Sequence, residues 1–195
     1  MLTAALLLLV PLLPAPSGGG GKVFLTPQEA LDLAFPKCAV EKTTHYLDEE
    51  TLELAGEAAG GEIASGVVRA YRATDKDGAL VGTAYFDRHQ VRTLPEVLMV
   101  VVAPDYEVLR IELLSFSEPL DYLPKAKWYG QFIGRSLGPE LALKKQIRHP
   151  AGATLTAHAT TDAVRRVLAL HQAVHGPPPQ PKAKAEAKAE AKAEG

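Results

Sequence analysis

The middle of the chain alternates between runs rich in β-branched and apolar residues and short polar segments that favour turns. Such runs favour strands, because β-branched and aromatic side chains pack well on a pleated sheet. The expected strands cover residues 67–74, 79–86, 97–103 and 108–116. The first two flank Asp-Lys-Asp-Gly and the last two flank Pro-Asp-Tyr-Glu, and strands joined by such short turns pair antiparallel. The pattern therefore predicts two β-hairpins in an antiparallel sheet.

Ahead of these strands the chain carries helix start and stop signals. Thr26 and Glu29 form a capping box with Pro27 at the first helical position. Asp48, followed by more acidic residues, starts a second helix, and the Gly60-Gly61 pair ends it. The elements predicted from these signals are a helix over 27–35, a strand over 39–47 and a helix over 49–59.

Two further helices are expected after the strands, over 125–133 and from about 155 to 173. Apolar residues recur at helical spacing in the last one, so one face should pack on the sheet. That face consists of Val164, Val167, Leu168 and His171. Because helices both precede and follow an antiparallel sheet, the predicted fold class is α+β.

Length, charge and cysteine content narrow the possible functions. The 195 residues have room for one ordinary domain plus tails, and we expect the domain over 22–176. A formal net charge of −2 without a basic stripe argues against nucleic-acid binding. Cys38 is the only cysteine, so no disulfide can form within the chain, and we expect a half-buried structural thiol rather than a reactive one.

The two ends differ in composition from the middle. Residues 2–13 are almost wholly apolar but shorter than the roughly 20 residues of a membrane span, and small residues follow where a signal peptide would be cleaved. We interpret 1–21 as a signal peptide and linker, which places the protein in the periplasm or at the outer face of the cytoplasmic membrane. An uncleaved anchor is the alternative. Residues 177–195 are predicted to be a Pro-rich and Lys/Ala/Glu low-complexity tail.

The candidate chemistry lies directly before the last predicted helix. The segment is Ala151-Gly152-Ala153-Thr154-Leu155-Thr156. Gly152 allows a tight turn or a close approach to a ligand, and the following helix end offers free N–H groups and a partial positive charge to a phosphate. Thr154 would hold its hydroxyl at this cradle. The alternative is an ordinary loop in which Thr154 or Thr156 is the helix N-cap.

This segment resembles the FMN-binding domain family, which includes the flavin subunits of ion-pumping NADH:quinone and ferredoxin:NAD oxidoreductases. The family carries Ser/Thr-Gly-Ala-Thr-x-Thr just before a C-terminal helix, and the threonine of Gly-Ala-Thr takes FMN through a phosphoester. The resemblance covers about 22–174 and implies that this threonine is Thr154. It also implies a Mg-dependent flavin transferase that attaches the FMN with FAD as donor.

A second stretch supports the resemblance. Glu118 and Pro119 follow the last predicted strand, and an aromatic segment with Trp128 and Gln131-Phe132-x-Gly134 comes next. The family has a Glu-containing loop near the isoalloxazine ring and then an aromatic segment with Gln-Phe-x-Gly. The cofactor-binding residues implied by the resemblance are Glu118, Pro119, Tyr122, Leu123, Ala151, Gly152, Ala153, Thr154, Leu155 and Thr156.

Two positions depart from the family pattern. Ala151 stands where the family usually has Ser or Thr, and Arg148 stands where it usually has an acidic residue that the transferase recognises. Covalent and non-covalent binding of FMN therefore both stay open, and Arg148 or His149 could pair with the phosphate. Glu118 could accept a hydrogen bond from the flavin or be a solvated loop carboxylate.

The function implied by the resemblance is that of an extracytoplasmic electron carrier which exchanges electrons with a membrane redox complex. A tether suits such a protein, because a cofactor lost outside the cytoplasm is not replaced and a tether keeps its effective concentration high. A module of the same fold that holds flavin non-covalently or not at all is the alternative, and a flavin enzyme acting on a small acceptor is a third. No catalytic residue is predicted, because no acid–base constellation stands out.

The remaining histidines and aromatic residues suggest structural roles. His171 and His175 are four apart on the last helix, but no third ligand is evident nearby in the sequence, so no metal site is predicted. His89 has Asp87 as the only carboxylate near it in the sequence, which favours a local structural pair. Trp128 and Phe132 are expected in the core.

Overall fold

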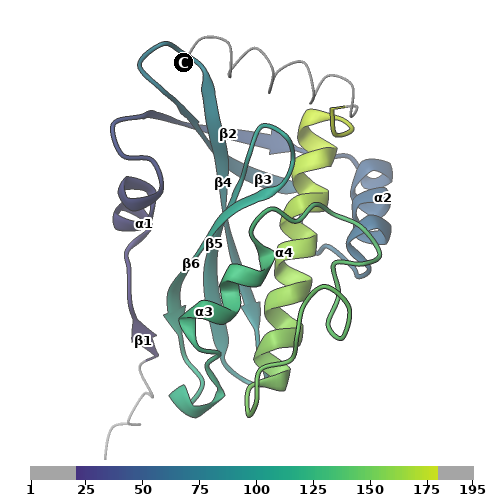
Figure 1. The fold of residues 1–195 in the computed structure, drawn as a ribbon. Helices are drawn as coiled ribbons and strands as arrows, with labels where there is room; N and C mark the ends of the chain where they lie inside the picture. Colours follow the sequence, from purple (N-terminus) through teal and green to yellow (C-terminus); the bar gives the residue numbers. More distant parts are fainter. Residues whose placement is uncertain (1–20, 180–195) are drawn as a thin grey trace, which may run out of the picture.

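The computed structural model describes residues 21–179, and its secondary structure lies between Lys22 and His175 (Figure 1). Residues 1–20 of the predicted signal peptide and linker, and residues 180–195 of the predicted tail, lie outside the described residues. The fold is α+β, as the sequence predicted: an antiparallel sheet has helices against both of its faces.

The sheet has six strands in the order β1-β6-β5-β4-β3-β2. Their bounds are Lys22–Val23 (β1), Ala39–Tyr46 (β2), Val67–Thr74 (β3), Leu80–Gln90 (β4), Pro95–Val102 (β5) and Val108–Phe116 (β6). The α-helices are Pro27–Ala34 (α1), Glu49–Ala59 (α2), Ala126–Tyr129 (α3) and Thr154–His175 (α4). Two short 3-10 helices cover Leu120–Tyr122 (η1) and Gly130–Phe132 (η2).

Both predicted hairpins are present, but they belong to one continuous meander. Strands β4 and β5 also pair with each other, with His89 directly opposite Glu96. Strand β4 continues to Gln90 rather than ending at 86, because its last residues keep pairing with the first residues of β5. This extension carries His89 to a position where it faces a residue of the next strand.

The central strand β5 is covered on both sides. Leu98, Val100 and Val102 belong to the core cluster that packs against α4, while Met99 and Val101 belong to the cluster that packs against α1. All five side chains have no exposed surface. A strand with both faces covered is expected to be almost continuously apolar, which explains the run of valines in this segment.

The segment 125–133 was predicted to be a single helix, and the structure corrects this. Helix α3 ends at Tyr129 and η2 takes over at Gly130, the residue least suited to a helix interior after proline. The expectation that Trp128 and Phe132 are core residues is confirmed, since they are 6% and 0% exposed and meet edge to face.

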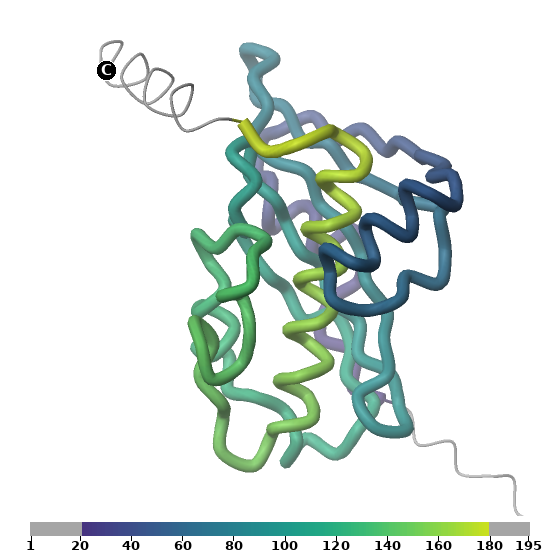
Figure 2. The backbone as a smooth tube through the Cα atoms, turned by 90° about the vertical axis from the view of Figure 1, so that its right-hand side faces the viewer, coloured from purple at the N-terminus to yellow at the C-terminus, as the bar shows by residue number. Residues whose placement is uncertain are grey.

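Helix α4 runs along the sheet with α2 on one side and the segment around 120–150 on the other (Figure 2). Its predicted apolar face is confirmed: Val164, Val167, Leu168 and His171 are all buried. The contact with α2 is made by Ala55, Ala59 and Ala169, and such small side chains let the two helices approach closely. This packing fixes α4, and with it the segment that carries the candidate chemistry.

Candidate functional site

Helix α4 begins directly after a left-handed turn. Gly152 has a φ of +79°, a conformation that favours glycine, and Ala153 is the N-cap without any side-chain cap. The N–H of Ala157 donates to the Ala153 carbonyl, whereas the N–H groups of residues 154–156 have no acceptor among the described residues. The alternative in which Thr154 or Thr156 caps the helix is therefore wrong, and the first turn keeps its donors open.

The two threonines of this turn have different surroundings. Thr156 is fully buried, and its hydroxyl donates to the Tyr122 carbonyl oxygen at 2.6 Å. Thr154 is exposed, and its hydroxyl has no partner within residues 21–179. Leu155 beside it is also exposed. Only the Thr154 hydroxyl is therefore free to react or to bind at this end of the helix.

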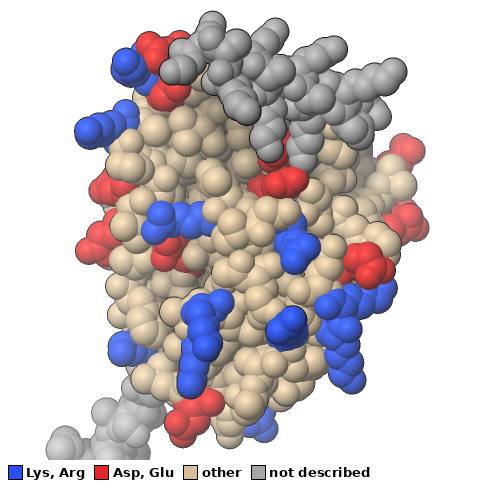
Figure 3. Space-filling view, viewed as in Figure 1, with Lys and Arg blue, Asp and Glu red and all other residues tan. Residues whose placement is uncertain are grey.

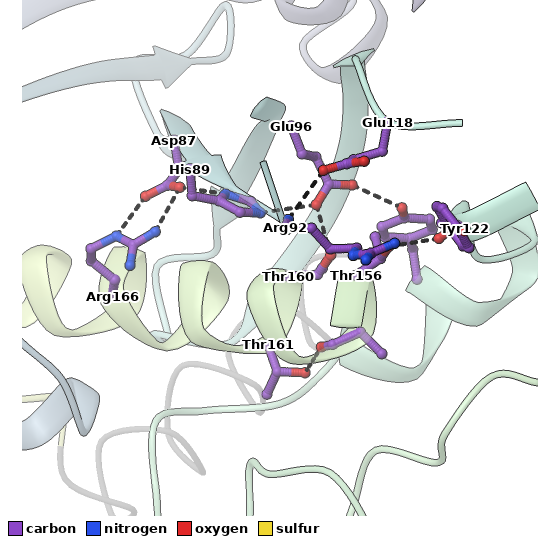
Figure 4. A network of polar contacts seen from close by, with 12 residues as sticks. Asp87, His89, Arg92, Glu96, Glu118, Tyr122, Thr156, Thr160, Thr161 and Arg166 are labelled. Carbon is purple, nitrogen blue, oxygen red and sulfur yellow. Dashed lines mark hydrogen bonds and ion pairs between the residues drawn. The ribbon is translucent and has the colours of Figure 1, made fainter. Parts of the chain in front are cut away.

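A small hollow, which we call the threonine pocket, lies beside this turn. Its volume is about 190 Å³, and Val91, Arg92, Tyr122 and residues 152–156 line it. The guanidinium of Arg92 lies 5.5 Å from the centroid of the Tyr122 ring, a cation–π contact that holds a positive charge at the pocket (Figure 4). The predicted site residues that the structure brings together here are Tyr122, Gly152, Ala153, Thr154, Leu155 and Thr156.

Glu118 has a structural role that neither sequence interpretation anticipated. Its Oε1 atom accepts from the backbone N–H groups of Arg92, Thr93 and Leu94, at 3.3, 2.8 and 2.9 Å. The N–H of Thr93, and then that of Leu94, holds the pKa of this carboxyl below its usual value. The residue is 7% exposed and its Oε1 atom accepts these hydrogen bonds, so the solvated-carboxylate alternative is wrong. Glu118 anchors the β4–β5 turn, and that turn carries Arg92 to the threonine pocket.

The other predicted site residues lie elsewhere. Pro119 is the exposed N-cap of η1 and lines neither cavity described here. Leu123 and Ala151 line a second cavity of about 770 Å³, which we call the basic pocket after its cationic rim of Lys125, Lys127, Arg135 and Arg148. His149 and Arg148 line this cavity and not the threonine pocket. The cation that lines the threonine pocket is thus Arg92, which the sequence did not single out.

A network of charged side chains, which range from 0% exposed for Glu96 to 24% for Arg166, crosses the layer between the sheet and α4 (Figure 4). His89 lies between two carboxylates: its Nδ1 is 2.9 Å from Asp87 and its Nε2 is 2.9 Å from Glu96. Arg166 of α4 donates two hydrogen bonds to Asp87, both at 2.8 Å. We call Asp87, His89, Glu96 and Arg166 the buried ion cluster. The expected local pair of His89 with Asp87 is present, and strand pairing adds Glu96, a second carboxylate that lies seven residues away in the sequence.

The ion cluster is internally satisfied. Glu96 is fully buried and also accepts from the Tyr129 and Thr160 hydroxyls, at 3.1 and 2.9 Å. Burial alone would lower the pKa of His89, but hydrogen bonds and charges from Asp87 and Glu96 raise it to about 9. His89 is therefore protonated near neutral pH, and two cations balance two carboxylates. Such a cluster holds the helix on the sheet and leaves no free acid or base.

His171 is buried, and it has no charged partner in the described part of the chain. Its Nδ1 lies 2.8 Å from the Tyr85 hydroxyl, and burial, helped by the nearby His175, lowers its pKa to about 3. His175 lies beside it with tilted ring planes. Within the described residues no group of three His, Cys, Asp or Glu side chains could hold a metal ion.

Comparisons with known proteins add no family. Neither the protein-family models nor the curated proteins include a match to this chain. Within residues 21–179 no helix is both long and apolar enough to cross a membrane.

Proposed function

We propose that this chain is an FMN-binding domain which carries one FMN for electron transfer, bonded through the flavin phosphate to the Thr154 hydroxyl. One observation carries the proposal: the first residue of the 22-residue helix α4 has an exposed hydroxyl without a partner among residues 21–179, and the helix N-terminus has no side-chain cap. The same threonine is the one that the resemblance to the FMN-binding domain family implies.

The surroundings of Thr154 fit a phosphate ester. The open N–H groups of residues 154–156 and the positive end of the helix dipole stabilise negative charge at this position. Arg92, in the same pocket, adds a formal positive charge that can pair with phosphate oxygens. Gly152 presents no side chain toward a ligand, and a Cβ built at this residue would meet no other atom within 4 Å.

The size of the threonine pocket explains why a bond to the protein would be needed. Pockets that bury most of a drug-sized ligand measure about 300–1,000 Å³, whereas this hollow measures about 190 Å³. Tyr122 and the exposed Leu155 can cover part of a flavin ring, but the hollow is too small to enclose it. Retention would therefore come from the tether, and the exposed ring edge would be open to a redox partner.

The residues around the pocket favour a carrier over an enzyme. Arg92 is the only formally charged residue that lines the threonine pocket in the described chain, and no carboxylate or histidine faces it. General acid–base catalysis needs such a group within hydrogen-bond reach of the substrate. We therefore propose electron exchange with a membrane redox complex, in a protein exported to the periplasm or to the outer face of the cytoplasmic membrane.

Attachment of the flavin would be a phosphoryl transfer at Thr154. The Oγ1 atom attacks the flavin-side phosphorus of FAD and forms a P–O bond, while AMP leaves with the bridging oxygen. The hydroxyl proton passes to a base or to water. Since neither a base nor a cation other than Arg92 lines the pocket in the described chain, a flavin transferase with FAD as donor is the expected partner for this step.

Intact mass spectrometry tests the proposal directly. The full-length chain is co-expressed with a flavin transferase, and a mass gain of one FMN moiety is expected. The Thr154→Ala variant should lose this gain and its in-gel flavin fluorescence. Thr44→Ala, which changes an exposed threonine of β2, is the matched control and should be labelled like the unmodified sequence.

Three other results would overturn the proposal in different ways. A yellow protein that releases FMN in acid would replace the phosphoester with non-covalent binding. Labelling that persists in Thr154→Ala would move the bond to another residue. A colourless protein in the presence of an active transferase would favour the alternative function, a binding or structural module of this fold.

A further inference from the structure

We propose that the basic pocket is a second ligand site, which takes a small anion bearing a flat ring, such as a nucleoside phosphate or an aromatic carboxylate. The cavity measures about 770 Å³, within the range of small-molecule sites and about four times the volume of the threonine pocket. Thr154, the residue proposed to carry the phosphoester, does not line this cavity.

The charge of the lining residues points to an anion. Lys125, Lys127, Arg135 and Arg148 contribute four positive charges and Asp121 one negative charge, which leaves three positive charges with His149 neutral. Figure 3 shows basic side chains gathered on the face where α3 and the loops beside α4 lie. Within residues 21–179, the side chains of Lys125, Lys127 and Arg148 make no ion pair. Three cations around one cavity therefore remain available to a ligand.

The apolar part of the cavity points to a ring. Leu123, Trp128 and Pro150 line it together with the cationic residues. Apolar and aromatic walls combined with a few convergent charged groups are characteristic of sites for small organic ligands. An inorganic anion would use only the cations, whereas an anion with a flat ring would use both kinds of surface.

The walls of the cavity are held in place by hydrogen bonds that leave the Arg148 side chain free. The indole N–H of Trp128 donates to the Arg148 carbonyl oxygen at 2.7 Å, and the Arg148 N–H donates to Gln131 Oε1 at 2.9 Å. The backbone of Arg148, a residue that lines the cavity, is thereby fixed. A preorganised wall lowers the entropic cost of binding.

His149 adds an independent observation. Its Nε2 atom is buried and has no hydrogen-bond partner in the described chain, although this residue lines the cavity. Buried polar atoms are normally paired with protein, water or ligand atoms. Because Nε2 has almost no accessible surface, the His149 ring would have to rotate toward the cavity before a ligand or a water could provide this partner.

The chain carries its own reporter for the test. Trp128 is its only tryptophan and lines the cavity, so in the folded protein its fluorescence responds to a ligand bound there. The full-length Thr154→Ala protein is titrated with ADP and, separately, with phthalate. Adenosine and pyrophosphate, which are fragments of ADP, are titrated in the same way. Calorimetry provides a second readout. We expect a saturable change with at least one ring-bearing anion, and affinity at least about tenfold weaker for each fragment.

Matched charge removals complete the design. Arg148→Gln and Lys127→Gln should each weaken binding about tenfold, as expected for the loss of a charge-assisted contact, while Lys76→Gln in the distant 75–78 turn should not. Preference for ADP over phthalate would identify nucleotides as the ligand class, and the opposite preference would identify aromatic carboxylates. The absence of a saturable signal at about 1 mM ligand, or equal affinity in all three variants, would overturn the inference. The proposed flavin bond is unaffected by either result, since the titrated protein lacks Thr154.

Discussion

Raising the pH should destabilise the protein through a single side chain, His89. The pKa of this histidine is raised from 6.5 to about 9 in the folded protein, so the folded state holds a proton more tightly than the unfolded state. The corresponding stabilisation is fully present below pH 6.5 and is lost as the pH rises through about 9. At about 1.4 kcal/mol per pH unit, the difference amounts to about 3 kcal/mol of unfolding free energy.

Urea unfolding followed by Trp128 fluorescence measures this loss. Trp128 is 6% exposed, so its emission should change strongly when the core opens. Unfolding free energies of the full-length chain are determined between pH 6 and pH 10, and His89→Gln is measured in parallel. The variant should be less stable at pH 6, and its pH profile should be flatter by about 3 kcal/mol.

The control variant is His158→Gln, which changes an exposed histidine of α4 and should keep the slope of the unmodified protein. NMR titration of the His89 ring checks the same quantity independently, and its protons should titrate near pH 9. Parallel profiles for the unmodified protein and His89→Gln would refute the reasoning, because the proton on His89 would then not be coupled to folding.

Three further predictions concern neighbouring groups. Burial lowers the pKa of His171 from 6.5 to about 3, so this residue stabilises the folded protein above pH 6.5 and that stabilisation is lost as the pH falls. The unfolding free energy should be about 2 kcal/mol lower at pH 5 than above pH 6.5, and His171→Phe should remove this dependence in urea unfolding. Thr156→Val leaves the Tyr122 carbonyl without its donor and should cost about 1–3 kcal/mol in the same assay, whereas Thr156→Ser should stay close to the unmodified protein. Glu118→Ala should accelerate amide hydrogen exchange at Thr93 and Leu94, measured by NMR, because their N–H groups lose their acceptor. Glu118→Gln keeps an acceptor oxygen, so exchange should be slower in this variant than in Glu118→Ala. Equal exchange rates in the two variants would contradict the turn-anchoring role.

Local signals predicted most of the elements. The capping box at Thr26 and Glu29 is present with both hydrogen bonds, and Asp48 caps α2 through the N–H of Thr51. Gly60 ends that helix in the left-handed conformation. These features could be predicted because each depends on residues three or four apart, whose geometry the helix itself determines.

Contacts between distant segments could not be predicted in the same way. Glu96 meets His89 because the register of β4 and β5 places them opposite each other, and nothing in either residue's neighbourhood reveals this register. Arg166 joins them only after α4 has packed on the sheet. A buried charged cluster therefore needs the tertiary fold, whereas its members look like ordinary surface residues in the sequence.

The candidate site was predicted in part. The turn at Gly152 and the helix that starts at Thr154 follow from local sequence, and the structure has them there. Arg92 could not be predicted as a site residue, because it lies in the β4–β5 turn, about 60 residues before Thr154. It lies at the pocket because Glu118 anchors that turn. Tertiary packing also places Leu123 and Ala151 at the basic pocket and the predicted residues of the turn at 152–156 at the threonine pocket.

The double coverage of β5 has a consequence for the order in which the chain is synthesised. One face of this strand is closed by α1, which precedes it, and the other by α4, which follows it by about fifty residues. Trp128, Phe132 and Ile147 of the same cluster precede α4 and cover part of that face, but its cover is completed only when α4 emerges. Until then Leu98, Val100 and Val102 stay partly uncovered, in a segment whose β-branched, nearly uncharged sequence favours aggregation. Chains truncated before Thr154 should therefore accumulate as insoluble aggregates, and the newly made protein depends on its last helix for solubility.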